Sequence, residues 1–212
     1  MESIQFQTED DVTIVGNYWG GSEHAVLLLH MMPATKESWE AFAEELHRKG
    51  FTVLAIDLRG HGESVEQEGN ILNYKDFTDA EHQESIADVE AAVAYLQEQG
   101  AIDIDIVGAS IGANLALWYQ SEHPEVHKTI LLSPGTNYRG IITEPFAEGL
   151  SEEQEVYFVA GTLDGSAVDM AKQIQSKISG RTEVKIYESS AHGTDLFAED
   201  ESLMDILIVW LE

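Results

Sequence analysis

Apolar residues occur in short runs along the chain, and these runs alternate with longer segments of mixed character. The runs at 25–30 and 51–58 are almost continuously apolar, which is typical of strands buried on both faces of a parallel sheet. Further strands are predicted at residues 104–108, 128–134, 155–161 and 182–189. Helices are predicted between these strands, at about 36–49, 84–97, 166–178 and 197–211, with another beginning just after residue 110.

Two additional strands are predicted at the start of the chain. Residues 3–9 and 12–20 have strand-like sequences, and the polar residues 9–11 predict a tight turn. A turn this short joins antiparallel neighbours, whereas alternating strands and helices predict right-handed crossovers and parallel strands. The sequence therefore predicts an α/β fold, with a mostly parallel central sheet, helices on both faces and an antiparallel N-terminal edge. No repeat or Gly/Ser/Pro-rich linker divides residues 1–212, which indicates a single domain.

Charge is the unusual property of the composition. The 212 residues include 39 acidic and 11 basic ones, which gives a formal net charge of −28. Such a field repels phosphate backbones and anionic lipid headgroups, which argues against nucleic-acid and membrane-surface partners. A solvated acidic surface is the simplest explanation of the excess. Adaptation to high salt and attraction of a cationic partner are the alternatives.

Composition also limits the compartment and the chemistry. The chain has no cysteine, which excludes disulfides and cysteine-ligated zinc. Its first residues lack a basic segment followed by an apolar one, so no signal peptide is predicted. The apolar run 203–211 is too short to cross a membrane and contains Asp205. We therefore expect a cytoplasmic protein, without a metal or nucleotide cofactor because no metal, P-loop or dinucleotide motif occurs.

A serine, an acid and a histidine each follow a predicted strand, in that order along the chain. They are Ser110, Asp164 and His192. Because active groups in such sheets collect at the carboxyl ends of the strands, we expect these three side chains to lie together. His192 would act as the base that activates Ser110, and Asp164 would orient the imidazole and stabilise its charged form. Asp169, one helical turn beyond Asp164, is the alternative acid.

Ser110 has a glycine two positions to either side, Gly108 and Gly112. A strand-to-helix turn sharp enough to expose the serine strains its torsion angles and brings neighbouring backbone close. Side chains at 108 and 112 would clash there, and glycine removes them. The helix that follows points its N-terminus, with free N–H groups, at the reaction centre.

The other histidines are interpreted as structural or surface residues. His30 and His61 lie in loops beside the predicted site, and we expect them to shape the backbone there. The remaining ones are predicted at the surface, namely His24, His47, His82, His123 and His127.

Several separated motifs resemble those of the α/β-hydrolase family, and together they cover nearly the whole chain. The segment GASIG at 108–112 matches the nucleophile elbow, and AGTLDG at 160–165 matches the strand end that carries the acid. The segment SSAHGTDLF at 189–197 matches the histidine loop, and residues 27–64 resemble the N-terminal half of esterase-like members.

This resemblance also implies an oxyanion hole. Its donors would be the backbone amides of Met32, two residues after His30, and of Ile111. Met31 replaces the glycine that usually follows this histidine in the family. The amide of Met31 is therefore the alternative first donor.

The resemblance and the three side chains imply acyl transfer to water through an acyl-enzyme. Many larger members insert a cap domain between the strands at 128–134 and 155–161, but residues 135–154 suffice here only for a short helix. We therefore expect an open site with modest apolar contact area. The side chains expected to provide it are Met31, Met32, Ile141, Ile142 and Phe146.

A lidless carboxylesterase for small or short-chain esters is the preferred hypothesis, with a small-molecule ester as the partner. Dienelactone-hydrolase-like, thioesterase or peptidase activity would use the same three side chains. From a different class, the fold could serve as a non-catalytic binding module. The sequence predicts neither the physiological ester nor the oligomeric state.

Overall fold

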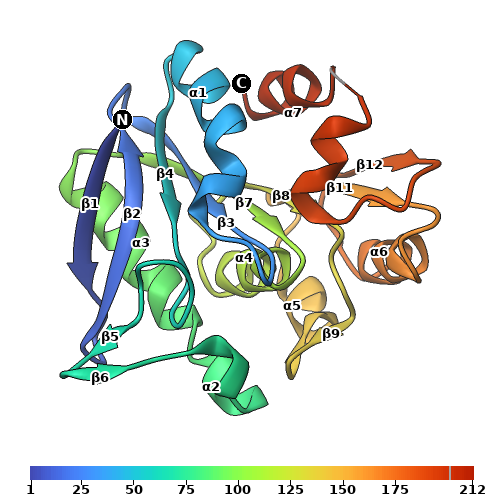
Figure 1. The fold of residues 1–212 in the computed structure, drawn as a ribbon. Helices are drawn as coiled ribbons and strands as arrows, with labels where there is room; N and C mark the ends of the chain where they lie inside the picture. The colour runs from blue at the N-terminus through green and yellow to red at the C-terminus, as the bar shows by residue number, and fades with distance from the viewer. Residues whose placement is uncertain (201) are drawn as a thin grey trace.

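A sheet of ten strands forms the centre of the computed structural model, which describes residues 1–200 and 202–212 (Figure 1). The strands follow the order β12-β11-β8-β7-β3-β4-β2-β5-β6, and β1 pairs with β2 outside this path. The longer strands are β1 (Glu2–Gln7), β2 (Val12–Trp19), β3 (His24–Leu29), β4 (Thr52–Ile56), β7 (Asp103–Ala109), β8 (Lys128–Leu132), β11 (Glu155–Gly161) and β12 (Thr182–Tyr187).

The middle of this sheet is parallel. Strand β3 pairs in parallel with β4 on one side and β7 on the other, so that Leu27 lies beside Leu54 and Ile106. Strands β8, β11 and β12 continue the parallel arrangement, whereas β2 runs antiparallel to β1 and β4. The predicted α/β fold with an antiparallel N-terminal edge is confirmed.

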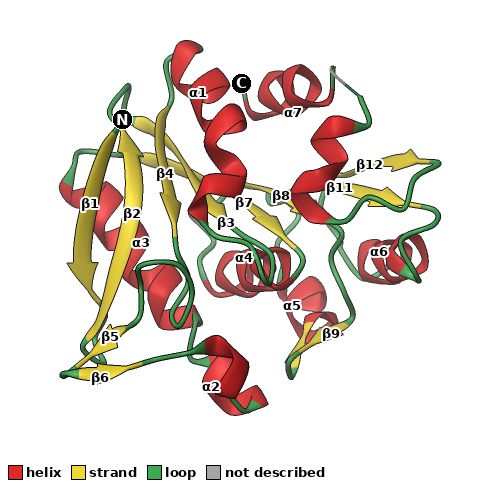
Figure 2. Ribbon diagram, viewed as in Figure 1, coloured by secondary structure: helices red, strands yellow, loops and turns green. Residues whose placement is uncertain are grey.

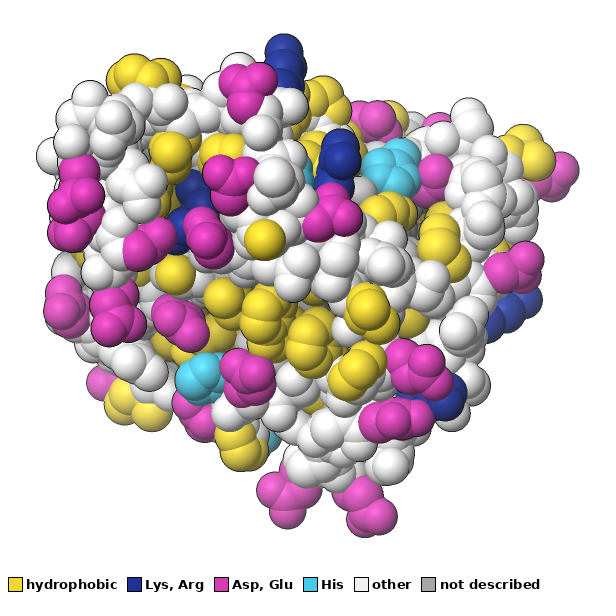
Figure 3. Space-filling view, turned by 90° about the horizontal axis from the view of Figure 1, so that it is seen from below, with side chains coloured by type: hydrophobic (Ala, Val, Ile, Leu, Met, Phe, Trp, Pro, Cys, Tyr) yellow, Lys and Arg dark blue, Asp and Glu magenta, His cyan; other side chains and the backbone are white. Residues whose placement is uncertain are grey.

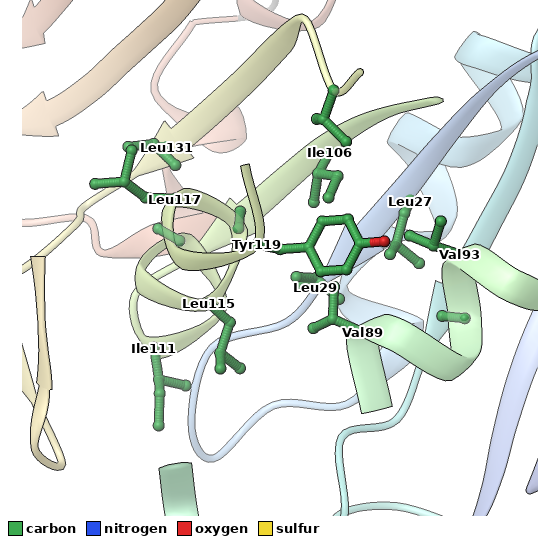
Figure 4. Packing of buried hydrophobic residues seen from close by; sticks show 14 of the residues in the cluster. Leu27, Leu29, Val89, Val93, Ile106, Ile111, Leu115, Leu117, Tyr119 and Leu131 are labelled. Carbon is green, nitrogen blue, oxygen red and sulfur yellow. The ribbon is translucent and has the colours of Figure 1, made fainter. Parts of the chain in front are cut away.

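Helices cover both faces of the sheet (Figure 2). The helices α1 (Glu40–Arg48) and α7 (Leu203–Leu211) pack on one face, and α3 (Ile86–Glu98), α4 (Ile111–Glu122) and α6 (Ala167–Gln175) pack on the other. In Figure 4, Tyr119 of α4 lies among side chains of the sheet and of α3, including Leu29 and Val89. Among the described residues, no helix is long and apolar enough to cross a membrane.

The segment expected to be a polar loop at 60–77 contains more structure than the sequence predicts. It forms the short strands β5 (Glu66–Gln67) and β6 (Asn70–Ile71) and a 3-10 turn at Tyr74–Asp76. Strand β5 extends the sheet because Gln67 pairs with Val12 of β2. A short helix, α2 (Asp79–Gln83), follows and begins at a capping box. These elements depend on contacts with distant segments, which hydrophobic periodicity does not report.

The ends of several helices also differ from the prediction. The helix expected at 36–49 begins as a 3-10 turn at Lys36–Trp39, and the last helix is preceded by a 3-10 turn at Gly193–Ala198. Between β8 and β11, the chain forms a hairpin of β9 (Asn137–Tyr138) and β10 (Ile141–Ile142), and then α5 (Thr143–Gly149). The expected short helix is therefore confirmed, and residues 135–154 contain no cap domain.

A buried ion pair joins two loops at the carboxyl edge of the sheet. The ammonium of Lys36, which is 2% exposed, lies 2.8 Å from the carboxylate of Asp57, which follows β4 and is fully buried. Asp57 also accepts the backbone N–H groups of Lys36 and Glu63, at 2.8 and 2.9 Å. The pair is thus hydrogen-bonded on several sides, as a buried charge must be. It holds the loop after β3 against the loop after β4.

Candidate active site

Ser110 occupies the sharp turn between β7 and α4. Its backbone has φ 54° and ψ −116°, a conformation that residues other than glycine rarely adopt. A Cβ atom added to Gly108 would lie 2.2 Å from the carbonyl oxygen of Gly112, and one added to Gly112 would lie 2.4 Å from that of Leu29. Neither position has room for a side chain, so the steric reason predicted for the two glycines is confirmed.

The turn is held on both sides of Ser110. Its N–H donates to the carbonyl of Leu132 in β8 at 2.8 Å, and its own carbonyl accepts from the N–H of Asn114 in α4 at 3.2 Å. The Ser110 side chain lies at the start of α4, where the first N–H groups, including that of Ile111, have no partner within the helix. Ser110 is only 8% exposed, so most of the residue is covered by its neighbours.

Asp164 and His192 form the second part of the site. The Nδ1 atom of His192 lies 2.8 Å from the Oδ2 atom of Asp164. The ends of β11 and β12 approach so closely that a Cβ at Gly161 would lie 2.4 Å from the carbonyl oxygen of Ser189. This close approach brings the acid turn and the histidine loop together. The alternative acid, Asp169, lies exposed on α6.

The bond between Asp164 and His192 has a chemical consequence. A carboxylate only accepts hydrogen bonds, so Nδ1 carries a proton and Nε2 remains free to accept another. Among the described residues, the Ser110 hydroxyl makes no hydrogen bond to His192. In enzymes without substrate such contacts are often long and tighten only when the substrate binds.

His30 shapes the loop predicted to supply the first oxyanion donor. Its ring is fully buried, its Nε2 accepts the N–H of Leu58 at 3.0 Å, and its Nδ1 lies 2.9 Å from the carbonyl oxygen of Met31. Because Nε2 accepts, Nδ1 carries the proton and donates to Met31. The ring therefore connects the loop after β3 to the end of β4. The donor amide, that of Met32 or of Met31, remains a prediction.

The side chain of Met31 lies against the histidine loop. A Cβ added to Gly193 would lie 2.5 Å from the sulfur of Met31 and 3.2 Å from the Cβ of Ala109. Met31 thus occupies space that is free only because residue 193 is glycine. This contact explains how a bulky residue fits where the family usually has glycine.

The other predicted substrate contacts lie in different surroundings. Ile141 is 1% exposed and packs in the core under α4, so the expectation that it contacts substrate is not supported by its position. Phe146 stacks on Trp118 with ring centroids 5.2 Å apart, roughly 12 Å along α4 from Ser110 at 1.5 Å per residue. Ile142 is exposed. Leu163, which precedes Asp164 and was not predicted as a site residue, is exposed as well.

Tyr138 is the site residue that sequence reasoning missed. Its hydroxyl donates to the carbonyl of Ser133 at 3.4 Å, and burial raises the pKa of Tyr138. The nearby Ser110 side chain opposes part of that rise in the pKa, and the charge of Asp164 adds to it. Tyr138 therefore lies beside both residues. The only signal in the sequence is that it follows the end of a strand, β8, by a few positions.

Two buried histidines lie next to each other beneath the loop after β4. The rings of His30 and His61 are 4.9 Å apart, and His61 stacks on Tyr74 with centroids 3.9 Å apart. Burial lowers the pKa of His30 to about 4, and burial together with His30 lowers the pKa of His61 to about 4.

His82 is also buried, at 2% exposed, so the prediction that it lies at the surface is wrong. Its ring packs edge-on against that of Phe77, five positions earlier in the chain.

These histidines predict a loss of stability in mild acid. An unfolded histidine has a pKa of about 6.5, so between that pH and about 4 the unfolded chain binds more protons than the folded one. The free energy of unfolding therefore falls as the pH decreases through this window. At about 1.4 kcal/mol per pKa unit, His61 contributes up to about 3 kcal/mol.

The measurement is urea unfolding at several pH values between 7 and 4. We expect His61→Gln to flatten the decrease, because the substituted side chain does not titrate. His47→Gln, at an exposed histidine on α1, is the matched control and keeps the original slope. An unchanged slope in His61→Gln would contradict the prediction.

A resident metal has no evident ligand set here. Within residues 1–200 and 202–212, no three His, Asp or Glu side chains converge as metal ligands would. The titratable groups of the site instead form the Asp164–His192 pair, and the histidine loop approaches Ala109, the residue before Ser110, at Gly193.

The strand order and the serine, acid and histidine at the strand ends define an α/β-hydrolase. A family model described as the alpha/beta hydrolase fold matches residues 24–178, and the chain belongs to this family. This finding agrees with the resemblance found in the sequence motifs.

Among known proteins, the chain is 32% identical to the bifunctional esterase/perhydrolase DCH of Acinetobacter calcoaceticus over 149 residues, 69% of this chain and 49% of that protein. It is 29% identical to the thermostable monoacylglycerol lipase of a Bacillus species over 101 residues, 48% of this chain and 36% of the lipase. The chain thus spans about half or less of the length of these relatives. An esterase of Pyrococcus furiosus shares the fold, with a TM-score of 0.79 at 20% identity, over 99% of this chain and 91% of that one.

Proposed function

We propose that this chain is a serine hydrolase that cleaves small or short-chain carboxylic esters. The observation that carries the proposal is the 2.8 Å bond between Asp164 and His192, at the same sheet edge as the strained turn that presents Ser110. A histidine held by a carboxylate next to a serine at the start of a helix is an arrangement suited to acyl transfer.

The reaction follows from these groups. The Ser110 oxygen attacks the ester carbonyl carbon while its proton passes to Nε2 of His192. The carbonyl oxygen becomes an oxyanion, which the amides of Met32 and Ile111 stabilise. The bond to the leaving oxygen then breaks, and His192 returns the proton to the departing alcohol. Water, deprotonated by His192, attacks the acyl-enzyme in the same way and releases the carboxylic acid.

The surroundings of the site support a small, uncharged substrate. Seen from below, toward the carboxyl ends of the parallel strands, Figure 3 shows hydrophobic side chains across the middle of this face, with acidic ones around them. Acidic side chains repel anionic substrates, while an apolar surface accepts an acyl chain. Residues 135–154 form only a hairpin and a short helix, so no cap domain adds apolar area for a long acyl chain.

Substrate size provides the test. We expect kcat/KM for nitrophenyl esters to be highest with short acyl chains and to fall with long ones. An extended apolar cleft would instead add about 0.8 kcal/mol of binding for each methylene buried. The measurement is one series of nitrophenyl esters from acetate upward, with a thioester and a peptide substrate alongside. A rate that climbs to long chains contradicts the open site, and a lack of turnover with every ester contradicts the function.

A further inference from the structure

Tyr138 is fixed in relation to Ser110 by a clamp that joins its hairpin to α4. The side chain of Asn114 is fully buried, and it donates to the carbonyl of Ile141 at 3.0 Å and accepts the N–H of Gly135 at 3.1 Å. The N–H of the same residue bonds the carbonyl of Ser110. Both ends of the segment that carries Tyr138 are therefore tied to the first turn of the helix that follows the serine.

The Tyr138 ring is also held from below. A Cβ added to Gly135 would lie 2.6 Å from two ring carbons of Tyr138, so the ring rests directly on this backbone. Its hydroxyl reaches the carbonyl of Ser133, whose own hydroxyl accepts the N–H of Gly193 at 3.1 Å. Tyr138 is thus connected through Ser133 to the loop of the histidine.

The topology decides on which side of the serine this hydroxyl lies. Strand β7, which ends just before Ser110, has β3 on one side and β8 on the other, followed by β11 and β12. The first predicted oxyanion donor comes from the loop after β3, while Asp164 and His192 come from the β11 and β12 side. Tyr138 follows β8, and its hydroxyl bonds the carbonyl of Ser133, whose own hydroxyl accepts the N–H of Gly193 next to His192. It therefore lies on the side from which His192 reaches the leaving group.

The phenol is suited to donate a hydrogen bond during the reaction. Burial and the charge of Asp164 raise the pKa of Tyr138 above its ordinary value. The hydroxyl therefore keeps its proton around neutral pH, where a histidine is neutral enough to act as a base.

We propose that the Tyr138 hydroxyl is a further catalytic group, which donates a hydrogen bond to the leaving oxygen of the bound ester. Its bond to the carbonyl of Ser133, at 3.4 Å, is exchanged for this one when the substrate enters. Tyr138 keeps its own proton: His192 delivers the proton to the alcohol, and the phenol stabilises the negative charge that develops on the oxygen as the bond breaks. In deacylation the attacking water occupies the same position. This inference rests on the proposed ester hydrolysis.

The test compares two acetate esters that share the acyl group and differ in the leaving group. Nitrophenol leaves readily as an anion, whereas an alkyl alcohol needs its developing charge stabilised. We expect Tyr138→Phe to lower kcat/KM for ethyl acetate, followed by acid release, roughly tenfold to a hundredfold more than for nitrophenyl acetate. Tyr95→Phe is the matched control: it also removes one tyrosine hydroxyl, on α3 against Phe6, and should leave the ratio unchanged.

Comparing the two esters within one variant separates this effect from a change in folding or in the amount of active enzyme. An equal loss with both esters would overturn the inference and would show that Tyr138 only positions Ser110. No loss with either ester would overturn it as well. A wild-type protein inactive on both esters would overturn the proposed function itself, which is a different result.

Discussion

Replacing Ser110 by alanine is expected to lower the rate of ester hydrolysis by at least about 10³-fold, because the serine, histidine and acid act as one unit. The fold should persist, since alanine keeps the Cβ atom and the backbone bonds to Leu132 and Asn114 do not involve the side chain. The measurement is kcat/KM with nitrophenyl acetate, together with circular dichroism of the purified variant.

A fluorophosphonate that labels activated serines provides the independent readout. The wild-type protein should be labelled on the peptide containing Ser110, and the variant should not be labelled. Ser190→Ala removes an exposed hydroxyl from the histidine loop and is the matched control. Substantial activity in pure Ser110→Ala, free of contaminating esterase, would exclude Ser110 as the nucleophile.

Removing the base should be as damaging as removing the nucleophile. We expect His192→Ala to lose at least about 10³-fold in kcat/KM, and Asp164→Asn to lose a similar amount or less. An amide at 164 can donate to Nδ1, which would favour the tautomer that leaves Nε2 unable to take the serine proton. The double variant Ser110→Ala, His192→Ala should be no slower than either single one.

Asp169→Asn is the control for the acid, since this carboxylate lies exposed on α6. Its kcat/KM should match the wild type. If Asp164→Asn were fully active and Asp169→Asn were not, the hydrogen bond between Asp164 and His192 would have no catalytic consequence and the acid would be Asp169.

The strained turn and the proposed mechanism depend on the same close packing. Gly108 and Gly112 let β7, α4 and the loop after β3 approach within backbone contact, and Gly193 leaves room for Met31 beneath the histidine loop. These contacts bring the loops after β3, β7 and β12 to one place. Since interiors are close-packed, a shift of one of these loops moves the others.

The sequence alone determined the architecture, and it predicted which three side chains lie together at one edge of the sheet. Apolar runs such as 25–30 can be buried only if both faces of the sheet are covered, and alternation with helices makes that sheet parallel. Parallel strands end at one edge, so Ser110, Asp164 and His192 could be expected together from their positions after three strands. The two glycines around Ser110 are required by the close backbone packing of a short turn. Because this requirement concerns residues adjacent in the chain, it can be inferred from the sequence.

Only the tertiary structure decided which other side chains surround the serine. Ile141 and Phe146 follow the same strand as Tyr138, yet the hairpin and α5 turn the first two into the core or along α4 and bring the third to Ser110. His82 is buried although no apolar periodicity in its short helix predicts it. In a loop, the direction of a side chain is set by contacts with distant segments, which residue type and spacing do not encode.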